Sequence, residues 1–266
     1  MVSFGALTGA GYERSMGRWS RRLAPLLIDF AGGIGEEELV LDVGCGTGSL
    51  TFALAARSPS AKITGVDVAQ TLLETARAAN PDPGRISFEQ ADAGALPHED
   101  GQFDRTLANV ALQHVNEIGT AVAEMARVTR RGGVVAATVW DQRGGLTYSR
   151  LFLDTAAAVD PAAVELRTSV QSRPGSRPDE LAAHWRRHGL HEVEQTSLMI
   201  RMEFASFADF WEPLAESMAY GSYLAALPAA AHKLVREKVE AAYRSGEADG
   251  PRSLTAVAWA VKGRKA

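Results

Sequence analysis

The sequence of 266 residues contains one cysteine, Cys45, which excludes an internal disulfide and suits a reducing compartment such as the cytoplasm. No apolar run approaches the roughly 18 residues that a membrane-spanning helix needs. The first residues, MVSFGALTGAGYERS, have neither a basic start nor a sustained apolar stretch, so they give no indication of a secretory signal. We therefore expect a cytoplasmic protein without a membrane partner.

An excess of positive charge is also missing. Lysine and arginine total 28 and aspartate and glutamate total 32, which gives a formal net charge of -4. Proteins that bind nucleic acids through phosphates usually carry a basic excess or a basic stripe. Arginines do cluster at 14–22 and 127–131, but the second cluster closes a predicted helix before Gly132, where cations complement the helix dipole. Nucleic acid is therefore not an expected partner.

Short apolar segments alternate with amphipathic ones through the first half of the chain. The predicted strands are 38–43, 62–66, 85–90, 103–109 and 133–140. The predicted helices between them are 49–56, 69–79 and 118–129. Such β-α alternation with short connections predicts a mostly parallel sheet with helices on both faces.

The second half is less regular. Residues 141–178 are rich in Gly, Pro, Arg and Ser, and helical patterns recur near 150–157, 161–168 and 179–188. A strand is predicted at 192–204 and a last one at 253–261. The segment between them, 207–243, has a helical pattern with breaks expected at Pro213, Gly221 and Pro228.

The most informative segment is LDVGCGTGSL, from Leu41 to Leu50, in which a strand is followed by three glycines and a helix. Glycine is needed where a backbone turns tightly and approaches a ligand, and the following helix offers unpaired N–H groups. A dinucleotide fingerprint would need glycine where Ser49 stands. Asp42 suits a ligand that carries an amine and would repel a pyrophosphate. A nicotinamide-dependent oxidoreductase is therefore an alternative that these residues disfavour.

Three further polar residues follow predicted strands. Asp67 stands about twenty residues beyond the last glycine, an offset at which a carboxylate binds ribose hydroxyls, and we expect it at an exposed strand end. Asp92 follows the third strand and can accept a hydrogen bond from an adenine amino group. Asn109 ends the fourth strand. Each alone is more typical of a cap or turn, but together they favour a ligand site at the carboxyl edge of the sheet.

These motifs resemble those of class I S-adenosylmethionine-dependent methyltransferases, of the small-molecule type similar to methyltransferase type 11. The matching segments are VLDVGCGTGSLT from Val40, GVDVAQ from Gly65, EQADAGALPHEDGQFD from Glu89, ANVALQHV from Ala108 and RVTRRGGVVAATVW from Arg127. The resemblance covers residues 10–141 and implies a doubly wound, seven-stranded, Rossmann-like α/β fold with an antiparallel last strand. It also implies transfer of a methyl group to a small-molecule acceptor by in-line displacement, in a monomer or homodimer.

The resemblance implies an S-adenosylmethionine site built from successive strand ends. The residues around the methionine portion would be Asp42, Gly44, Cys45, Gly46 and Gly48. Those around the ribose and adenine would be Asp67, Val68, Asp92 and Ala93. Those near the sulfonium would be Asn109 and Val110.

Residues 12–20 and His114 can each be interpreted in two ways. Residues 12–20 resemble an N-terminal element that folds over the cofactor and presents Tyr12, Met16 and Trp19, and they also fit an amphipathic helix packed on the core. His114 could be a catalytic general base near the acceptor. It could instead pack or bind the backbone, which we favour because methyl transfer from a sulfonium often needs only positioning and desolvation.

The expected organisation is a single methyltransferase domain over 1–266. Its parts would be an N-terminal helical cap, 1–35, a cofactor-binding core, 36–141, and substrate-side insertions, 142–178 and 205–250. The second insertion carries residues that suggest a partly apolar acceptor, namely Trp211, Met218, Tyr220 and Tyr223. The six histidines are scattered, so no metal site is expected. A non-catalytic S-adenosylmethionine-binding sensor is a second alternative, because no residue is evidently the catalyst.

Overall fold

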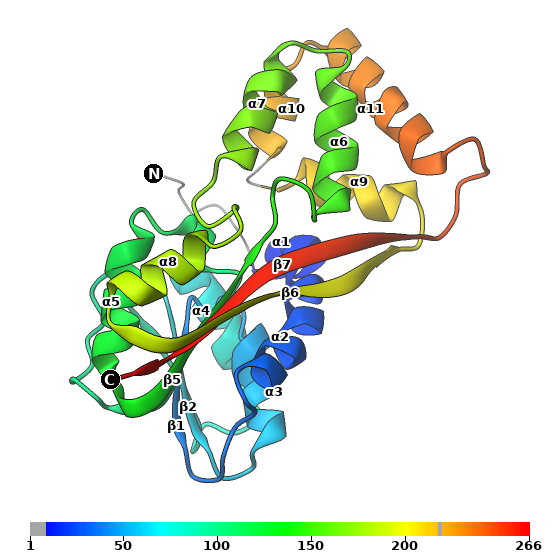
Figure 1. Cartoon of the computed structure of the whole chain (residues 1–266). Coiled ribbons are helices and arrows are strands. Elements are labelled where there is room, and N and C mark those ends of the chain that lie inside the picture. The colour runs from blue at the N-terminus through cyan, green and yellow to red at the C-terminus, as the bar shows by residue number, and fades with distance from the viewer. Residues whose placement is uncertain (1–8, 218–219) are drawn as a thin grey trace.

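The computed structural model describes residues 9–217 and 220–266 (Figure 1). One sheet runs through it, with strand order β3-β2-β1-β4-β5-β7-β6. The strands are β1 Leu39–Val43, β2 Lys62–Asp67, β3 Ile86–Gln90, β4 Phe103–Asn109, β5 Thr129–Trp140, β6 Leu190–Phe204 and β7 Arg252–Lys265. Strands β1 to β5 pair in parallel, and β7 lies antiparallel to both β5 and β6. The predicted seven-stranded fold with an antiparallel last strand is confirmed.

The order of the strands fixes where a ligand can bind. Strand β1 pairs with β2 on one side and with β4 on the other. The chain therefore winds outward in opposite directions from β1 and β4, and their carboxyl ends form the topological switch point at which such sheets bind ligands. The glycine loop leaves the carboxyl end of β1.

Helices cover both faces of the sheet, because successive strand residues point to opposite sides. The helices are α1 Gly9–Tyr12, η2 Glu13–Gly17, α2 Arg18–Phe30, α3 Ser49–Arg57, α4 Gln70–Ala78, η3 Leu112–His114, α5 Ile118–Val128, α6 Thr147–Ala157, α7 Ala162–Gln171, α8 Glu180–Arg187, α9 Phe207–Ala215, α10 Gly221–Ala226 and α11 Ala229–Arg244. Val40 packs with α2 and α3 in one buried cluster, whereas Leu41 packs with α5 and α8 in another. In the described part of the chain, none of the helices is long and apolar enough to cross a membrane.

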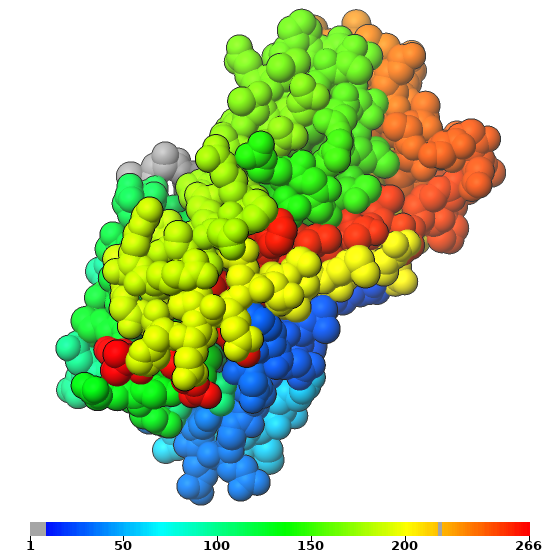
Figure 2. Space-filling model, in the orientation of Figure 1, coloured from blue at the N-terminus to red at the C-terminus, as the bar shows by residue number. Residues whose placement is uncertain are grey.

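A second layer of helices stands beyond the carboxyl end of β5 (Figure 1). It consists of α6, α7, α9, α10 and α11. The long strands β6 and β7 extend from the rest of the sheet to this layer, as Figure 1 and Figure 2 show. Its interior is aromatic, with Phe152 beside Tyr220 at 5.0 Å between ring centroids and Phe210 beside Tyr243 at 5.3 Å. We refer to these five helices as the helical layer.

Some predicted boundaries are wrong, for identifiable reasons. Pro213 does not break the helix but lies inside α9. Proline cannot donate to the carbonyl four residues earlier, and that carbonyl, of Asp209, instead accepts a hydrogen bond from Arg18 Nη2 at 3.2 Å. The last strand is longer than predicted because its full length pairs with β6, from Leu190 opposite Lys265 to Phe204 opposite Arg252. The other two expected breaks are confirmed, since Gly221 begins α10 and Pro228 precedes α11.

Candidate active site

The loop between β1 and α3 has left-handed backbone at each of its glycines. The angle φ is 72° at Gly44, 55° at Gly46 and 90° at Gly48. Residues other than glycine rarely adopt these positive φ values. A Cβ atom on Gly44 would lie 2.3 Å from the Cβ atom of Ala111. A Cβ atom on Gly46 would meet nothing nearer than the ring of Tyr12, at 3.8 Å. Packing therefore requires glycine at 44, whereas at position 46 a Cβ atom would make only an ordinary van der Waals contact with Tyr12.

Asp67 holds this loop in place from the end of β2. Its Oδ2 accepts a hydrogen bond from the Gly46 N–H and its Oδ1 accepts one from the Ala69 N–H, both at 2.9 Å. Burial raises the pKa of Asp67, and the N–H donors oppose that rise. The expectation of an exposed strand end is wrong, because the glycine loop folds back onto the carboxylate and leaves it half-buried. Asp67 is consequently a structural anchor of the loop as well as a candidate ribose ligand.

Asp42 is fully buried beneath the same loop. Its Oδ2 accepts a hydrogen bond from Thr51 Oγ1 at 2.6 Å, but its Oδ1 has no partner among the described residues. Burial raises the pKa of this carboxyl to about 7. The hydroxyl of Ser49, at the start of α3, is also buried without a described partner. Because buried polar atoms are nearly always hydrogen-bonded, these two atoms indicate where a polar ligand group would be accommodated.

The residues predicted for ribose and adenine lie at the neighbouring strand ends. Strands β2 and β3 are in register with Asp67 opposite Gln90, which places Asp92 two residues beyond that pair. Asp92 is exposed, and its Oδ1 accepts a hydrogen bond from the Gly94 N–H at 2.8 Å. Val68 is 48% exposed and Ala93 is half-buried. The sheet thus brings these residues to one accessible edge, and their contact with a cofactor stays a prediction.

Asn109 and Val110, predicted to lie near the sulfonium, are held by neighbouring elements. Asn109 Nδ2 donates to the Ser20 carbonyl at 3.0 Å, and its Oδ1 accepts from Thr138 Oγ1 at 2.8 Å. The side chain therefore ties α2 to β5. Val110 has φ of 51°, an unfavourable conformation for a β-branched residue, and its N–H donates to the Thr138 carbonyl at 3.0 Å. Both residues are buried at the switch point.

The N-terminal element crosses the glycine loop. One carboxylate oxygen of Glu13 accepts a hydrogen bond from Thr47 Oγ1, and the other pairs with Arg21. The hydroxyls of Tyr12 and Ser20 share a hydrogen bond at 3.3 Å. Burial, together with smaller contributions from charges that include Asp67, raises the pKa of Tyr12 to about 12. The described part of the predicted cap therefore lies against the loop, whereas residues 1–8 are outside the described residues.

Sequence reasoning missed Glu13 and Thr47. Glu13 begins a turn of π-helix, a rare conformation that no simple periodicity announces. The turn is compact because Gly17 faces the Glu13 carboxylate, where a Cβ atom would lie only 2.7 Å from it. Gly17 is the one sequence signal that could have indicated this close approach.

Trp19 and Met16 have a different environment from Tyr12. Trp19 is 2% exposed, its ring lies 5.3 Å from that of Phe204, and the Arg18 guanidinium stands 4.3 Å from its ring centroid. Met16 packs against the same buried cluster. For these two residues the contacts are those of an amphipathic helix on the core, the second of the two interpretations.

His114 ends the short turn η3 at the carboxyl edge of the sheet. Its Nε2 lies 3.3 Å from Gln113 Nε2, and Gln113 Oε1 accepts a hydrogen bond from the Trp140 N–H at 2.9 Å. His114 is exposed to solvent, yet the protein close around its ring, with a smaller contribution from the charge of Arg173, lowers its pKa to about 4. A general base works best when its pKa is near the working pH. These surroundings therefore favour a neutral, positioning imidazole over a base.

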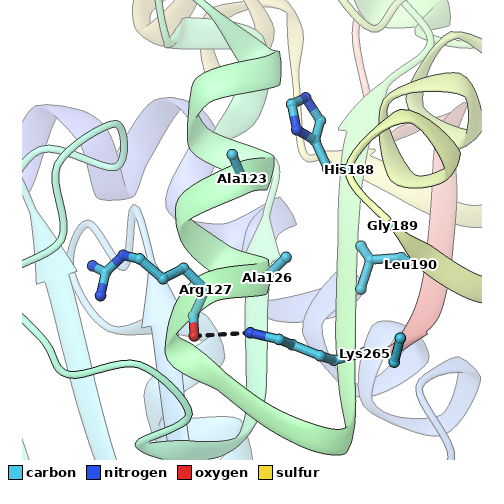
Figure 3. Close-up of a pocket in the computed structure, with 8 residues that line it drawn as sticks. Ala123, Ala126, Arg127, His188, Gly189, Leu190 and Lys265 are labelled. Carbon is cyan, nitrogen blue, oxygen red and sulfur yellow. Dashed lines mark hydrogen bonds between the residues drawn. The ribbon is translucent and has the colours of Figure 1, made fainter.

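A hollow of about 280 Å³ lies elsewhere, beside the C-terminal end of α5 (Figure 3). Its lining includes Arg127, His188 and Leu190, and Lys265 Nζ donates to the Arg127 carbonyl at 3.1 Å within it. None of the predicted site residues lines this hollow. Among residues 9–217 and 220–266, no group of three or more His, Cys, Asp or Glu side chains could hold a metal ion.

The glycine loop lies within a segment that is similar to known proteins. Residues 40–133 match the family model described as a methyltransferase domain. Demethylmenaquinone methyltransferase of Staphylococcus aureus is 35% identical over 104 residues, 39% of this chain and 43% of the relative. An uncharacterized 37.1 kDa protein in transposon TN4556 of Streptomyces fradiae is 39% identical over 107 residues, 39% of this chain and 31% of the relative. The matches thus span less than half the length of either relative.

Solved structures resemble the chain over nearly all of its length. A putative methyltransferase from Bacillus halodurans C-125 has a TM-score of 0.59 at 19% identity, covering 91% of this chain and 98% of that one. Phosphoethanolamine N-methyltransferase 2 of Haemonchus contortus, solved with S-adenosyl-L-methionine, has a TM-score of 0.60 at 16% identity, covering 97% and 56%. At such identities the likeness concerns the fold. Residues 40–133 are thus similar in sequence to a methyltransferase domain, and the chain as a whole has the fold of these solved structures.

Proposed function

We propose that this chain transfers a methyl group from S-adenosylmethionine to a small-molecule acceptor in the cytoplasm. The observation that carries the proposal is Asp42, a fully buried carboxylate with one oxygen that no described residue satisfies, beneath a left-handed glycine loop. A buried carboxyl of this kind either keeps a proton or pairs with a positive group when it ionises. An ammonium group supplies one, whereas a pyrophosphate would be repelled.

The residues at the strand ends fit the remaining parts of the cofactor. Asp42 would hold the ammonium, directly or through water, and the backbone of the loop from Gly44 through Cys45 and Gly46 to Gly48 would border the methionine portion. Each carboxylate oxygen has two lone pairs, so Asp67 could accept ribose hydroxyls while it keeps its bonds to the loop. The residues that would border adenine are Val68, Asp92 and Ala93. When bound, S-adenosylmethionine supplies an activated methyl group on a sulfonium.

The contribution of the protein is alignment and exclusion of water. Tyr12 and Glu13 would close the loop from one side, and Asn109 and Val110 would form the wall near the sulfonium. The acceptor would enter between the sheet edge and the helical layer, so that its nucleophilic atom approaches the methyl carbon opposite sulfur. His114 would position the acceptor from η3, because its lowered pKa, about 4, makes it a weak base at neutral pH.

The acceptor class follows from charge and shape. The net charge of -4 gives a phosphate backbone no long-range attraction. The helical layer stands over the same edge of the sheet as the glycine loop, with Tyr220 and Phe152 in its interior. Both features support a small, partly apolar acceptor over a nucleic acid.

Calorimetric titration with S-adenosylhomocysteine and with NAD tests the cofactor, and release of S-adenosylhomocysteine over a panel of small metabolites tests the reaction. We expect S-adenosylhomocysteine to bind, NAD to give no heat, and turnover to depend on an added small molecule. Binding of NAD instead would indicate an oxidoreductase. Tight S-adenosylhomocysteine binding without turnover on any acceptor would indicate a sensor.

A further inference from the structure

The turn between α7 and α8 contains a positive charge that the protein does not balance. Arg173 is half-buried, and its guanidinium forms no hydrogen bond or ion pair with any residue in the described part of the chain. The other arginines that lack such partners are all exposed, namely Arg131, Arg143, Arg177, Arg186 and Arg187. Because it is the half-buried one among these arginines, Arg173 is the arginine at which an external anion is most strongly indicated.

The fold places this turn at the edge of the sheet that carries the candidate active site. A Cβ atom on Gly175 would lie 3.3 Å from Val139 of β5 and 3.5 Å from Ile118 of α5. After desolvation, the charge of Arg173 is the second cause of the lowered pKa of His114. The same charge opposes the rise that desolvation causes in the pKa of Tyr220. The turn therefore packs against the carboxyl edge of the sheet, and the charge of Arg173 affects the pKa values of His114 in η3 and of Tyr220, which precedes α10.

Two neighbouring polar atoms also lack protein partners. Ser176 Oγ belongs to the same turn, and Ser176 is 1% exposed. Gln142 Oε1 follows β5, three residues after the Val139 that the turn contacts, and Gln142 is 4% exposed. Neither atom has a hydrogen-bond partner among the described residues. Native proteins leave few buried polar groups unsatisfied. The Ser176 hydroxyl, in the same turn as Arg173, can donate a hydrogen bond to an anion, whereas Gln142 Oε1 can only accept and would bind a donor group of the ligand.

We propose that Arg173 binds an anionic group of the methyl acceptor, a carboxylate or a phosphate, and so selects small acids with an apolar body. This inference rests on the proposed function, since it assigns the acceptor side of the same site. A guanidinium presents a planar fork of donors that matches two oxygens of a carboxylate or phosphate. The apolar body would lie toward the helical layer, in whose interior the rings of Phe152 and Tyr220 are buried.

The test uses benzoate, phenyl phosphate and the neutral benzamide as probes of the full-length protein saturated with S-adenosylhomocysteine. Affinities are measured by calorimetry for the wild type, Arg173→Gln and Arg173→Lys. Arg177→Gln is the matched control, because Arg177 lies in the same turn but is exposed. We expect at least one anion to bind more tightly than benzamide, and Arg173→Gln to weaken it by about tenfold or more. Arg173→Lys should retain part of the affinity and Arg177→Gln all of it, and the tighter anion identifies carboxylate or phosphate.

Three results would overturn the inference while the proposed function stands. They are binding of benzamide as tight as that of both anions, anion affinity unchanged in Arg173→Gln, and a drop in the melting temperature of Arg173→Gln that shows a structural role. Failure of S-adenosylhomocysteine to bind the wild-type protein would instead contradict the proposed function. The titration with S-adenosylhomocysteine alone separates the two failures.

Discussion

The glycine loop and the helical layer face each other but depend on different kinds of interaction. The loop is defined by backbone geometry and buried charge: three glycines with positive φ, the anchor Asp67 and the unsatisfied Asp42. The helical layer is defined by aromatic packing, as between Phe152 and Tyr220. Backbone geometry demands particular residues at fixed spacing, whereas packing tolerates many apolar combinations. The residues on the cofactor side can therefore be predicted from the sequence, whereas those on the acceptor side cannot.

The N-terminal element joins these two regions. Glu13 bonds Thr47 of the glycine loop. Arg18 pairs with Asp209 in the first turn of α9 at 2.8 Å, and Arg14 pairs with Glu216 just after its last turn at 2.7 Å. A ligand that orders the loop would consequently also restrict the motion of α9, through these ion pairs. Some of the following substitutions should destabilise or disable one region without the other, and some measure how much the ion pairs between them contribute to stability.

Gly44→Ala should have the largest effect. The added Cβ atom would lie 2.3 Å from that of Ala111, at a residue with φ of 72°. We expect the free energy of unfolding to fall by about 2–4 kcal/mol, from overpacking and left-handed strain. Chemical denaturation measures it. Gly46→Ala is the matched control, because its Cβ atom has 3.8 Å of clearance and only strain remains. Equal losses in the two variants would show that Ala111 does not constrain the loop.

Asp67→Ala should weaken binding of S-adenosylhomocysteine by about tenfold or more, since hydrogen bonds to a charged acceptor contribute about 1.5–3 kcal/mol each. The structure adds a loss of stability, because the N–H groups of Gly46 and Ala69 lose their acceptor. Calorimetry and thermal melting separate the two effects. Asp92→Ala, at an exposed residue, should weaken binding without the stability loss. Unchanged affinity in Asp67→Ala would remove this residue from the site.

Asp42 predicts a pH dependence with a definite sign. Burial raises its pKa from the usual 3.8 to about 7. In that window the native state holds a proton that the unfolded state has lost, so the free energy of unfolding of the unliganded protein should fall as pH rises from about 4 to about 7. An ammonium-bearing ligand requires the ionised carboxylate, so affinity for S-adenosylhomocysteine should rise over the upper part of this range. Asp42→Asn should lose both trends, and a variant that keeps them would contradict the assignment.

Arg14→Ala should have the smallest effect. Both partners of the Arg14 and Glu216 pair are more than half exposed, at 59% and 57% of their side chains. Exposed ion pairs contribute about 0–1 kcal/mol, so denaturation should show little change. Arg18→Ala should cost more, because Arg18 also stacks on Trp19 and binds the Asp209 carbonyl. If Arg14→Ala were the more damaging variant, the connection between the regions would depend on the outer pair.

Local pattern was sufficient to predict the strands and the site that their ends create. Strand β4 is predicted at the residues it occupies, Phe103–Asn109. The same holds for the glycine loop, where each glycine has the positive φ that its spacing implied. These features depend on residues within a few positions of one another.

What could not be predicted depends on distant residues. Pro213 stays within a helix because Arg18, far away in sequence, satisfies the carbonyl it frees. Asp67 is half-buried because the loop returns to it from residue 46. The effect of the Arg173 charge on the pKa values of His114 and Tyr220 depends on the fold and could not be predicted from the sequence. Tertiary contacts decide all three, and Met218, expected near the acceptor, lies outside the described residues.

The most direct test of the central claim, that the cofactor occupies the glycine loop at the sheet edge, is amide hydrogen exchange with and without S-adenosylhomocysteine. We predict strong protection at residues 42–50 and 67–69, weaker protection at 92–94 and 9–22, and little change at 229–244 in α11. Protection confined to the hollow beside α5, at residues 123–127 and 188–190, or no change at 42–50 in protein shown to be saturated, would contradict the account.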